Sequence, residues 1–323
     1  MARRPFVRTS VVATMLAAVL LAAGCGGGST GQVGAVEKRN LTVAIVPAVD
    51  SVGVYIAVQR GFFAAEGLHV KIVPATSSST VIVGQLTGRY DVTNGNYVSY
   101  ILAAAQQHAD LRILAEGSIM EQHTQAVLVQ AGSPIKTVAQ LKGKSIGVNV
   151  PNNIGTLLVS STLGVYGIKP SQVRFVPIPF PQMAAALKAH QVDAAWLPEP
   201  FITAAQTATG ANVLFDTDQG ATQNLPISCY VVTQSWEEQY PSTAAAFERA
   251  LVKAQAVADT NRTAVERAMV AFTGVSSDAA ALIADPNYPL RIDHGRIQRV
   301  ADLMLRFGLL KQSFNVTPMI QRG

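Results

Sequence analysis

Polar and aromatic residues that could hold a small molecule recur directly after short apolar segments of the chain. In open α/β sheets a ligand lies beyond the carboxyl ends of the strands, beside the N-termini of helices. We therefore expect a binding cleft at these segment ends. The candidate ligand contacts are Asp50, Ser51, Thr76, Ser77, Ser78, Asn94, Asn96, Tyr97, Glu116, Asn152, Asn153, Gly155, Thr156, Phe180, Trp196 and Glu199.

The charges at these segment ends favour a ligand that carries an amine. Free backbone N–H groups at the helix starts would attract a carboxylate, sulfonate or nitrate. These N–H groups belong to Val52, Thr80, Tyr97 and Gly155. However, no Lys or Arg falls at a predicted strand end, whereas Asp50, Glu116 and Glu199 do. We expect a neutral or zwitterionic solute with an amine, such as a taurine-like or aminopyrimidine-like molecule, over a bare anion.

Several candidates have a structural alternative that stays open. Asp50 could cap the helix that follows it, because Asp is favoured at that position. The asparagines could satisfy tight turns. Tyr97, Phe180 and Trp196 would stack on a planar ligand or its methylene groups, but Trp196 could also form a wall of the hinge.

Motifs for catalysis and metal binding are missing from the sequence. Residues 143–147 are spelled like a nucleophile elbow, but that motif needs a strand before it and a helix after it, and here the predicted order is reversed. The histidines have no metal-ligand spacing, so we expect neither a metal nor another cofactor. A rival remains, because a lyase or dehydratase could recruit Asp50 or Glu116 together with His123.

The elements that must position these residues alternate between short strands and alanine-rich helices, as in βαβ units around a mostly parallel sheet. In the first series we expect strands at 41–46, 68–73, 89–93 and 111–115 and helices at 52–60, 81–87 and 97–107. In the second series we expect strands at 126–130, 145–149, 173–178, 193–197 and 213–215 and helices at 137–142, 152–166, 182–190 and from 201. A return strand at 228–233 precedes helices at 241–258, 264–272, 277–283 and 296–307.

This order predicts an α/β fold with two lobes and two crossovers between them. A mature chain of about 300 residues exceeds what one core usually serves. Lobe 1 should comprise residues 41–125 plus 229–323, with the helical C-terminal segment packed on it, and lobe 2 residues 126–228.

The N-terminus has the order of a secretory signal peptide: basic residues, an apolar run at 11–23, and then Cys25. Residues 21–25 resemble a bacterial lipobox with its usual leucine one position early, so we expect residues 1–24 to be removed and Cys25 to receive a lipid. Ordinary cleavage near an incidental cysteine is the alternative. Arg3 and Arg4 suit the twin-arginine or the Sec export route, and residues 25–40 have the composition of a flexible linker.

Charge and cysteine content argue against two further function classes, nucleic-acid binding and cysteine chemistry. The chain has 25 Lys and Arg against 20 Asp and Glu, and removal of the three arginines within residues 1–24 lowers the net charge from +5 to +2. No basic stripe with interleaved aromatics remains, so nucleic acid is not an expected partner. If Cys25 is lipidated, Cys229 has no disulfide partner, and its apolar neighbours favour an inert, buried strand residue.

Four stretches resemble the solute-binding proteins of nitrate, sulfonate and taurine importers and of thiamine pyrimidine-precursor importers. They are 54–68, with Arg-Gly-Phe-Phe and Glu-Gly-Leu, and 88–92, 140–148 and 191–201, the last with Val-Asp-Ala-Ala and Glu-Pro-Phe. The resemblance covers about residues 41–235. It implies a periplasmic-binding-protein-like fold of type II that closes on its ligand and delivers it to an ABC permease driven by an ATPase on separate chains.

We therefore expect a solute-binding protein and not an enzyme, anchored as a lipoprotein on the outer face of the cell membrane and monomeric. The alternative is an enzyme on the same fold that acts on a pyrimidine or quinone precursor. A sensor that reports the ligand to a partner is also compatible with the sequence.

Overall fold

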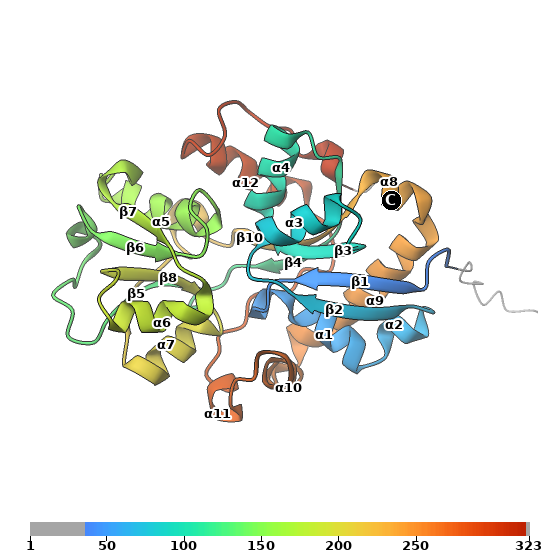
Figure 1. Cartoon of the computed structure of the whole chain (residues 1–323), viewed down its shortest axis with the longest axis horizontal. Coiled ribbons are helices and arrows are strands. Elements are labelled where there is room, and N and C mark those ends of the chain that lie inside the picture. The colour runs from blue at the N-terminus through green and yellow to red at the C-terminus, as the bar shows by residue number, and fades with distance from the viewer. Residues whose placement is uncertain (1–35, 321–323) are drawn as a thin grey trace, which may run out of the picture. The chain divides into compact units, whose positions relative to one another are not determined.

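Two five-stranded mixed sheets form the framework of residues 36–320, the part of the chain that the computed structural model describes (Figure 1). The predicted signal peptide, Cys25 and most of the predicted linker lie outside the described residues. The α/β prediction with two crossovers is confirmed.

The first sheet, here sheet A, has the order β2-β1-β3-β10-β4. Its strands are β1 (Asn40–Ile45), β2 (His69–Pro74), β3 (Val92–Asn96), β4 (Leu111–Ile119) and β10 (Pro226–Thr233). β1 runs parallel to β2 and β3, whereas β10 is antiparallel to β3 and β4. β3 is buried along its whole length and β1 is exposed only at Asn40, because helices cover both faces of the sheet.

The second sheet, sheet B, has the order β7-β6-β8-β5-β9. Its strands are β5 (Gln125–Val129), β6 (Ser145–Val148), β7 (Arg174–Pro177), β8 (Ala194–Pro198) and β9 (Asn212–Asp216). β6 is parallel to β7 and β8, and β5 is antiparallel to β8 and β9. Each sheet thus combines parallel βαβ strands with one antiparallel strand that enters from the other sheet.

The chain crosses between the sheets twice, after β4 and after β9. The two crossings are joined by backbone hydrogen bonds, from Met120 N to Leu225 O at 2.9 Å and from Thr217 N to Gln125 O at 3.0 Å. This pairing of two connections is what a hinge between two lobes requires. The lobe boundaries at 125/126 and 228/229 stay predictions.

Helices flank both sheets. They are α1 (Val52–Gln59), α2 (Phe62–Ala65), α3 (Ser78–Leu86), α4 (Tyr97–Gln107), α5 (Ile154–Val165), α6 (Phe180–Lys188), α7 (Phe201–Thr209), α8 (Gln234–Gln239), α9 (Pro241–Thr260), α10 (Arg262–Thr273), α11 (Ser277–Ala280) and α12 (His294–Arg306). Of the C-terminal helices, α9 packs on α1 and α2, α10 on α1, and α12 on α4, as predicted, while α11 also contacts α7 beside sheet B.

Among the predicted elements that differ from the observed ones, three bear on the position of the candidate contacts or on the nature of an element. The helix expected at 137–142 is a 3-10 turn, Val138–Leu141, capped by Thr137. β3 begins three residues later than expected, because Asp91 is held in a turn by the backbone N–H of Thr42, at 2.8 Å, and by Lys38 Nζ, at 2.6 Å. β4 continues to Ile119 because β10 pairs along its whole length. Asn94 and Glu116 therefore lie within strands and not at strand tips, whereas Asn96 is the last residue of β3.

Candidate functional site

A polar cavity lies between the two sheets and receives side chains from both. Its empty volume, including the part open to solvent, is about 430 Å³. Sheet A contributes residues after β1, at the end of β3 and at the start of β10, and sheet B contributes residues at the ends of β6 and β8 and the start of β5. The lining residues are Val46, Ala48, Asp50, Ser78, Asn94, Gly95, Asn96, Gln125, Asn149, Ile154, Phe180, Trp196, Pro198, Ile227 and Ser228.

Six of the predicted contacts line this cavity: Asp50, Ser78, Asn94, Asn96, Phe180 and Trp196. Hydrogen bonds to neighbouring elements hold Asn94 and Asn96 in place. Asn96 accepts a hydrogen bond from Ser99 N at 2.9 Å, which begins α4, and its Nδ2 donates to Ser78 Oγ at 2.9 Å. Asn94 Nδ2 donates to Cys229 O at 3.3 Å. The two asparagines are thus fixed by β10 and α3 and line the cavity from the last residues of β3.

Asp50 is the ionisable group of the cavity lining. It lies in the 3-10 turn Val49–Ser51 and makes no side-chain cap with the helix that follows. Ser118 Oγ donates to Asp50 Oδ1 at 2.8 Å and lies 3.0 Å from Ser228 Oγ. Burial raises the pKa of Asp50 to about 6, against the opposing effect of the Ser118 hydrogen bond. The lining contains neither Lys nor Arg, so a bound cation would meet the carboxylate without competition.

Three further polar atoms of the lining are buried and have no hydrogen-bond partner. They are Gln125 Oε1, Asn149 Oδ1 and Trp196 Nε1. An unpartnered buried donor or acceptor costs about 1–3 kcal/mol, so a ligand that supplies the missing partners stabilises the closed site. Together these atoms offer two acceptors, or amide donors if the amides are turned, and one indole donor.

Trp196 owes its position to Gly155 at the start of α5. A Cβ atom on Gly155 would lie 2.4 Å from Trp196 Cε3, so the indole ring packs directly on the backbone of that helix. Phe180 lies against the ring of Trp196 at 5.7 Å between centroids and against Phe201 at 5.1 Å. Gly155 thus serves the packing of Trp196.

Sequence reasoning missed Gln125, Asn149, Gly95 and Ser228. Asn149 follows β6, so it lies beyond the carboxyl end of a parallel strand, where ligand contacts are expected. Gln125 and Ser228 lie at the beginnings of antiparallel strands, which reach the same edge from the opposite direction. The carboxyl-end rule cannot find such residues.

The structure places the other predicted contacts outside this lining. Ser51 Oγ donates to Val46 O and Ala48 O and so folds the loop after β1. Ser77 caps α3, Asn153 caps α5, and Asn152 N donates to Thr156 Oγ1 at 3.0 Å. Thr76 lines a second cavity described below.

Tyr97 and both predicted glutamates are used inside the fold. Tyr97 is fully buried. Glu116 accepts from Arg296 Nη2 at 2.9 Å and from Asp293 N at 2.7 Å. Glu199 accepts from Thr203 N at 3.1 Å and from Thr203 Oγ1 at 2.8 Å, so it caps α7.

The expectation of free N–H groups is wrong at two helix starts. Val52 N donates to Val49 O, and Thr80 N donates to Ser77 Oγ. Because these donors are occupied, they cannot hold an anion. His123 is exposed and pairs with Asp216, with Nδ1 3.4 Å from Oδ2, so the structure does not place it with Asp50 or Glu116 as the rival enzyme would require.

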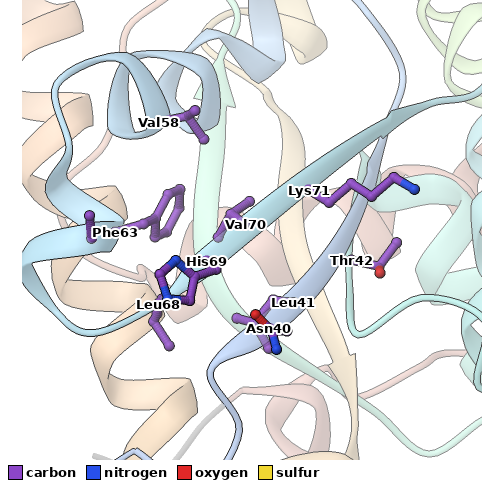
Figure 2. Close-up of a pocket in the computed structure, with 10 residues that line it drawn as sticks. Asn40, Leu41, Thr42, Val58, Phe63, Leu68, His69, Val70 and Lys71 are labelled. Carbon is purple, nitrogen blue, oxygen red and sulfur yellow. The ribbon is translucent and has the colours of Figure 1, made fainter.

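A different cavity lies along β1 and β2, close to their amino ends, where Asn40 and His69 begin the two strands (Figure 2). It is lined by Asn40, Leu41, Thr42, Val58, Phe63, Ala64, Leu68, His69, Val70 and Lys71. Its lining includes no buried polar atom without a partner. We therefore take the polar cavity between the sheets as the candidate binding site.

Within residues 36–320, no helix is both long and apolar enough to cross a membrane. Over the same residues, no group of three or more His, Cys, Asp and Glu side chains is arranged to hold a metal ion.

Comparison with known proteins places this geometry in a family. A family model described as "NMT1/THI5 like" matches residues 48–262. Over 68% of its length the chain is 28% identical to the bicarbonate transport ATP-binding protein CmpC of Synechocystis sp. (strain ATCC 27184 / PCC 6803 / Kazusa), of which it covers 35%. It is 27% identical to the taurine-binding periplasmic protein of Escherichia coli (strain K12), over 68% of this chain and 66% of that protein. The chain thus spans between about a third and two thirds of these relatives.

Solved structures confirm the fold. The alkanesulfonate-binding protein SsuA from Xanthomonas axonopodis pv. citri bound to MOPS superposes with a TM-score of 0.76 at 18% identity, over 90% of this chain and all of that one. The desulfurization enzyme DSZB superposes with a TM-score of 0.65 at 20% identity, over 85% of this chain and 94% of that one. The same fold thus occurs in a binding protein and in an enzyme. By the match of its family model over two thirds of its length, the chain belongs to the NMT1/THI5-like family.

Proposed function

We propose that the protein is the solute-binding component of an ABC importer and that it captures a small organic solute in the polar cavity between sheets A and B. The solute is taurine-like or aminopyrimidine-like, and it passes unchanged to a membrane permease with its ATPase on separate chains. One observation carries this proposal: Gln125 Oε1, Asn149 Oδ1 and Trp196 Nε1 are buried without hydrogen-bond partners, and their residues line one cavity together with Asp50.

The electrostatics of the lining favour an amine. A bare anion would enter a cavity with no Lys or Arg and would face the Asp50 carboxylate. Desolvation and like-charge repulsion would then raise the free energy of the bound anion. An amine would donate to Asp50, while the amides of Gln125 and Asn149 and the indole N–H satisfy the other polar atoms of the solute. A zwitterion fits if its anionic end meets those donors.

Contacts across the cavity support capture by closure. Val49 N donates to Glu199 O at 3.2 Å, and Asn153 Nδ2 donates to Ser99 Oγ at 2.8 Å. Each bond joins an element beside sheet A to one beside sheet B. A ligand that bridges the two sets of side chains shifts the population toward this closed arrangement by its differential affinity for it.

The cellular setting rests on the sequence. We propose that residues 1–24 are a signal peptide, that Cys25 carries a lipid, and that the monomeric protein is held at the outer face of the cell membrane by the linker 25–40. The relatives named as transport and periplasmic proteins support this setting. Metabolic labelling with a fatty acid should mark the wild-type chain and not a Cys25→Ala variant.

Thermal denaturation with a panel of solutes tests the capture step. Taurine, alkanesulfonates, nitrate, aminopyrimidines and aromatic acids should be compared, since a ligand that binds only the folded state raises its melting temperature. We expect a shift with an amine-bearing member and none with nitrate. Mass spectrometry of the released ligand decides against the enzyme alternative if the ligand is unchanged; a converted product would support it. No shift with any member would remove the proposed solute classes.

A further inference from the structure

A second, apolar cavity adjoins the polar one. Its empty volume, including the part open to solvent, is about 1170 Å³. Its lining contains only two hydroxyls and no ionisable side chain: Val46, Pro47, Pro74, Ala75, Thr76, Phe180, Pro181, Pro200, Phe201, Ala204, Phe272, Thr273 and Val275. Here it is called the Phe–Pro cavity.

Two residues line both cavities, Val46 after β1 and Phe180 at the start of α6. The Phe180 ring lies between Trp196 of the polar cavity and Phe201 of the Phe–Pro cavity, with centroid distances of 5.7 and 5.1 Å. The wall shared by the two cavities therefore includes the Phe180 ring and the Val46 side chain. A molecule in the polar cavity that extends past this wall enters an apolar space.

The Phe–Pro cavity is built by both halves of the fold. The lining residues between positions 46 and 76 come from the ends of β1 and β2. Those between 180 and 204 come from α6 and the start of α7, and those between 272 and 275 come from the end of α10. Phe272 is held in place by Tyr55, whose ring stacks on it at 3.5 Å between centroids. Phe201 and Phe272 are only half-buried, so a hydrocarbon group placed between them would remove their remaining apolar surface from water.

We propose that the ligand is amphiphilic, with an amine that faces Asp50 in the polar cavity and an alkyl or aryl group that occupies the Phe–Pro cavity. This inference rests on the proposed function and narrows its ligand. A solute confined to the polar cavity leaves the adjoining apolar walls exposed to water. A ligand with a hydrocarbon end gains by covering them, at about fourfold in affinity for each buried methylene.

The test uses primary n-alkylamines as probes, from propylamine to heptylamine, with the protein purified in its exported form. Calorimetric affinities should rise by about fourfold for each added methylene. Alcohols and carboxylates of the same chain length should bind at least about tenfold more weakly, because a charge-assisted bond to Asp50 is lost. The variant Asp50→Asn should remove the preference for the amine over the alcohol and keep the dependence on chain length.

A matched pair of variants on α7 locates the hydrocarbon. Ala204 lines the Phe–Pro cavity and is half-buried, whereas Ala208 is exposed on the same helix and does not line it. Ala204→Phe fills the cavity, so it should abolish the gain from propylamine to heptylamine and leave propylamine binding within about twofold. Ala208→Phe should leave the whole series unchanged.

Affinities that do not change with chain length, or no binding by any alkylamine, would overturn the amphiphilic ligand. The same holds if Ala208→Phe changes the series as strongly as Ala204→Phe, because the hydrocarbon would then bind the outer surface of the helix. Capture and unchanged release of taurine or an aminopyrimidine would leave the proposed function intact in each of these cases. Failure of every solute in the thermal panel counts against the proposed function itself.

Discussion

Asn153 of α5 donates a hydrogen bond from Nδ2 to Ser99 Oγ of α4, at 2.8 Å, and its Oδ1 accepts from Ile154 N at 2.7 Å. One side chain thus begins the helix beside sheet B and joins it to the helix beside sheet A. The two roles use different atoms of the amide. They can therefore be separated by substitution.

Ser99→Ala leaves the Asn153 cap of α5 in place and removes the oxygen that accepts from Asn153 Nδ2. We expect stability near that of the wild type and a ligand affinity lowered by about tenfold, since the closed arrangement loses a hydrogen bond worth about 1 kcal/mol or slightly more. Asn153→Ala should also lose about 1 kcal/mol of unfolding free energy, because the cap is removed. Chemical denaturation and calorimetry measure the two quantities. Equal affinity in the wild type and Ser99→Ala would show that the Ser99 bond does not contribute to closure.

The pKa of Asp50 predicts a dependence on pH. Burial raises this pKa from 3.8 to about 6, so the folded state binds a proton more tightly than the unfolded chain does. The associated stability is fully present below about pH 4 and is lost as the pH rises through about 6, by up to about 3 kcal/mol. Asp50→Asn should remove this step. To test this, melting temperatures of the wild type and of Asp50→Asn should be measured between pH 4 and 8 in the absence of ligand. The pH-dependent step should be present only in the wild type.

The affinity for a cationic ligand should depend on pH in the opposite direction to the stability. A probe with a fixed positive charge requires the Asp50 carboxylate, so its affinity should fall as the pH drops below about 6, approaching tenfold for each pH unit. The Asp50→Asn variant should bind it weakly at every pH. A wild-type affinity that stays constant between pH 5 and 8 would mean that Asp50 does not face the cation.

The sequence predicted most of the strand-helix order, and what it missed has a local cause. β3 was expected at 89–93, because Arg89-Tyr-Asp-Val-Thr alternates as a strand does. In the structure Tyr90 packs on Gly84, where a Cβ would lie 2.2 Å from the ring, and Asp91 is bound by Thr42 N. The Asp91 contact joins segments that are 49 residues apart in the sequence, so local propensity could not place the strand.

The site was predictable only in part, for a reason of topology. Asp50, Ser78, Asn96, Phe180 and Trp196 lie at or after the ends of parallel strands or begin helices, which the periodicity of the sequence reveals. Gln125 and Ser228 reach the cavity because β5 and β10 run antiparallel to their neighbours. Strand direction depends on pairing with a distant strand, and no residue in the local sequence specifies it.

Trp196 should report ligand binding by its fluorescence. The chain has two tryptophans, and Trp236 lies beside sheet A with its Nε1 donating to Asp91 at 2.9 Å. In a Trp236→Phe variant only Trp196 emits. Because its Nε1 has no partner within the fold, a ligand that accepts from it should change both the intensity and the wavelength of emission. A saturating ligand that leaves the emission unchanged would place the indole outside the site. Trp196→Phe, with Trp236 intact, is the control for indirect changes.

Glu116 and Arg296 form an ion pair that should contribute to stability and not to ligand affinity. Glu116 is buried in β4, and Arg296 of α12 is partly exposed. Burial raises the pKa of Glu116, and the hydrogen bonds from Arg296 and Asp293 N oppose this rise. Glu116→Gln should cost about 3 kcal/mol of unfolding free energy, because the guanidinium loses its partner. The affinity for an amine probe should stay within about twofold, since Glu116 does not line the polar cavity.

Arg296→Met separates the pair from the opposite side, because it leaves the carboxyl group buried without a partner. This variant should be less stable than the wild type at pH 8. It should regain part of the difference as the pH falls and Glu116 takes up a proton, since a carboxyl group whose pKa is raised in the folded state is stabilised by protonation. Urea denaturation at pH 5 and 8 measures this. If Glu116→Gln lowered affinity by tenfold or more while retaining wild-type stability, Glu116 would instead be a ligand contact, as the sequence predicts.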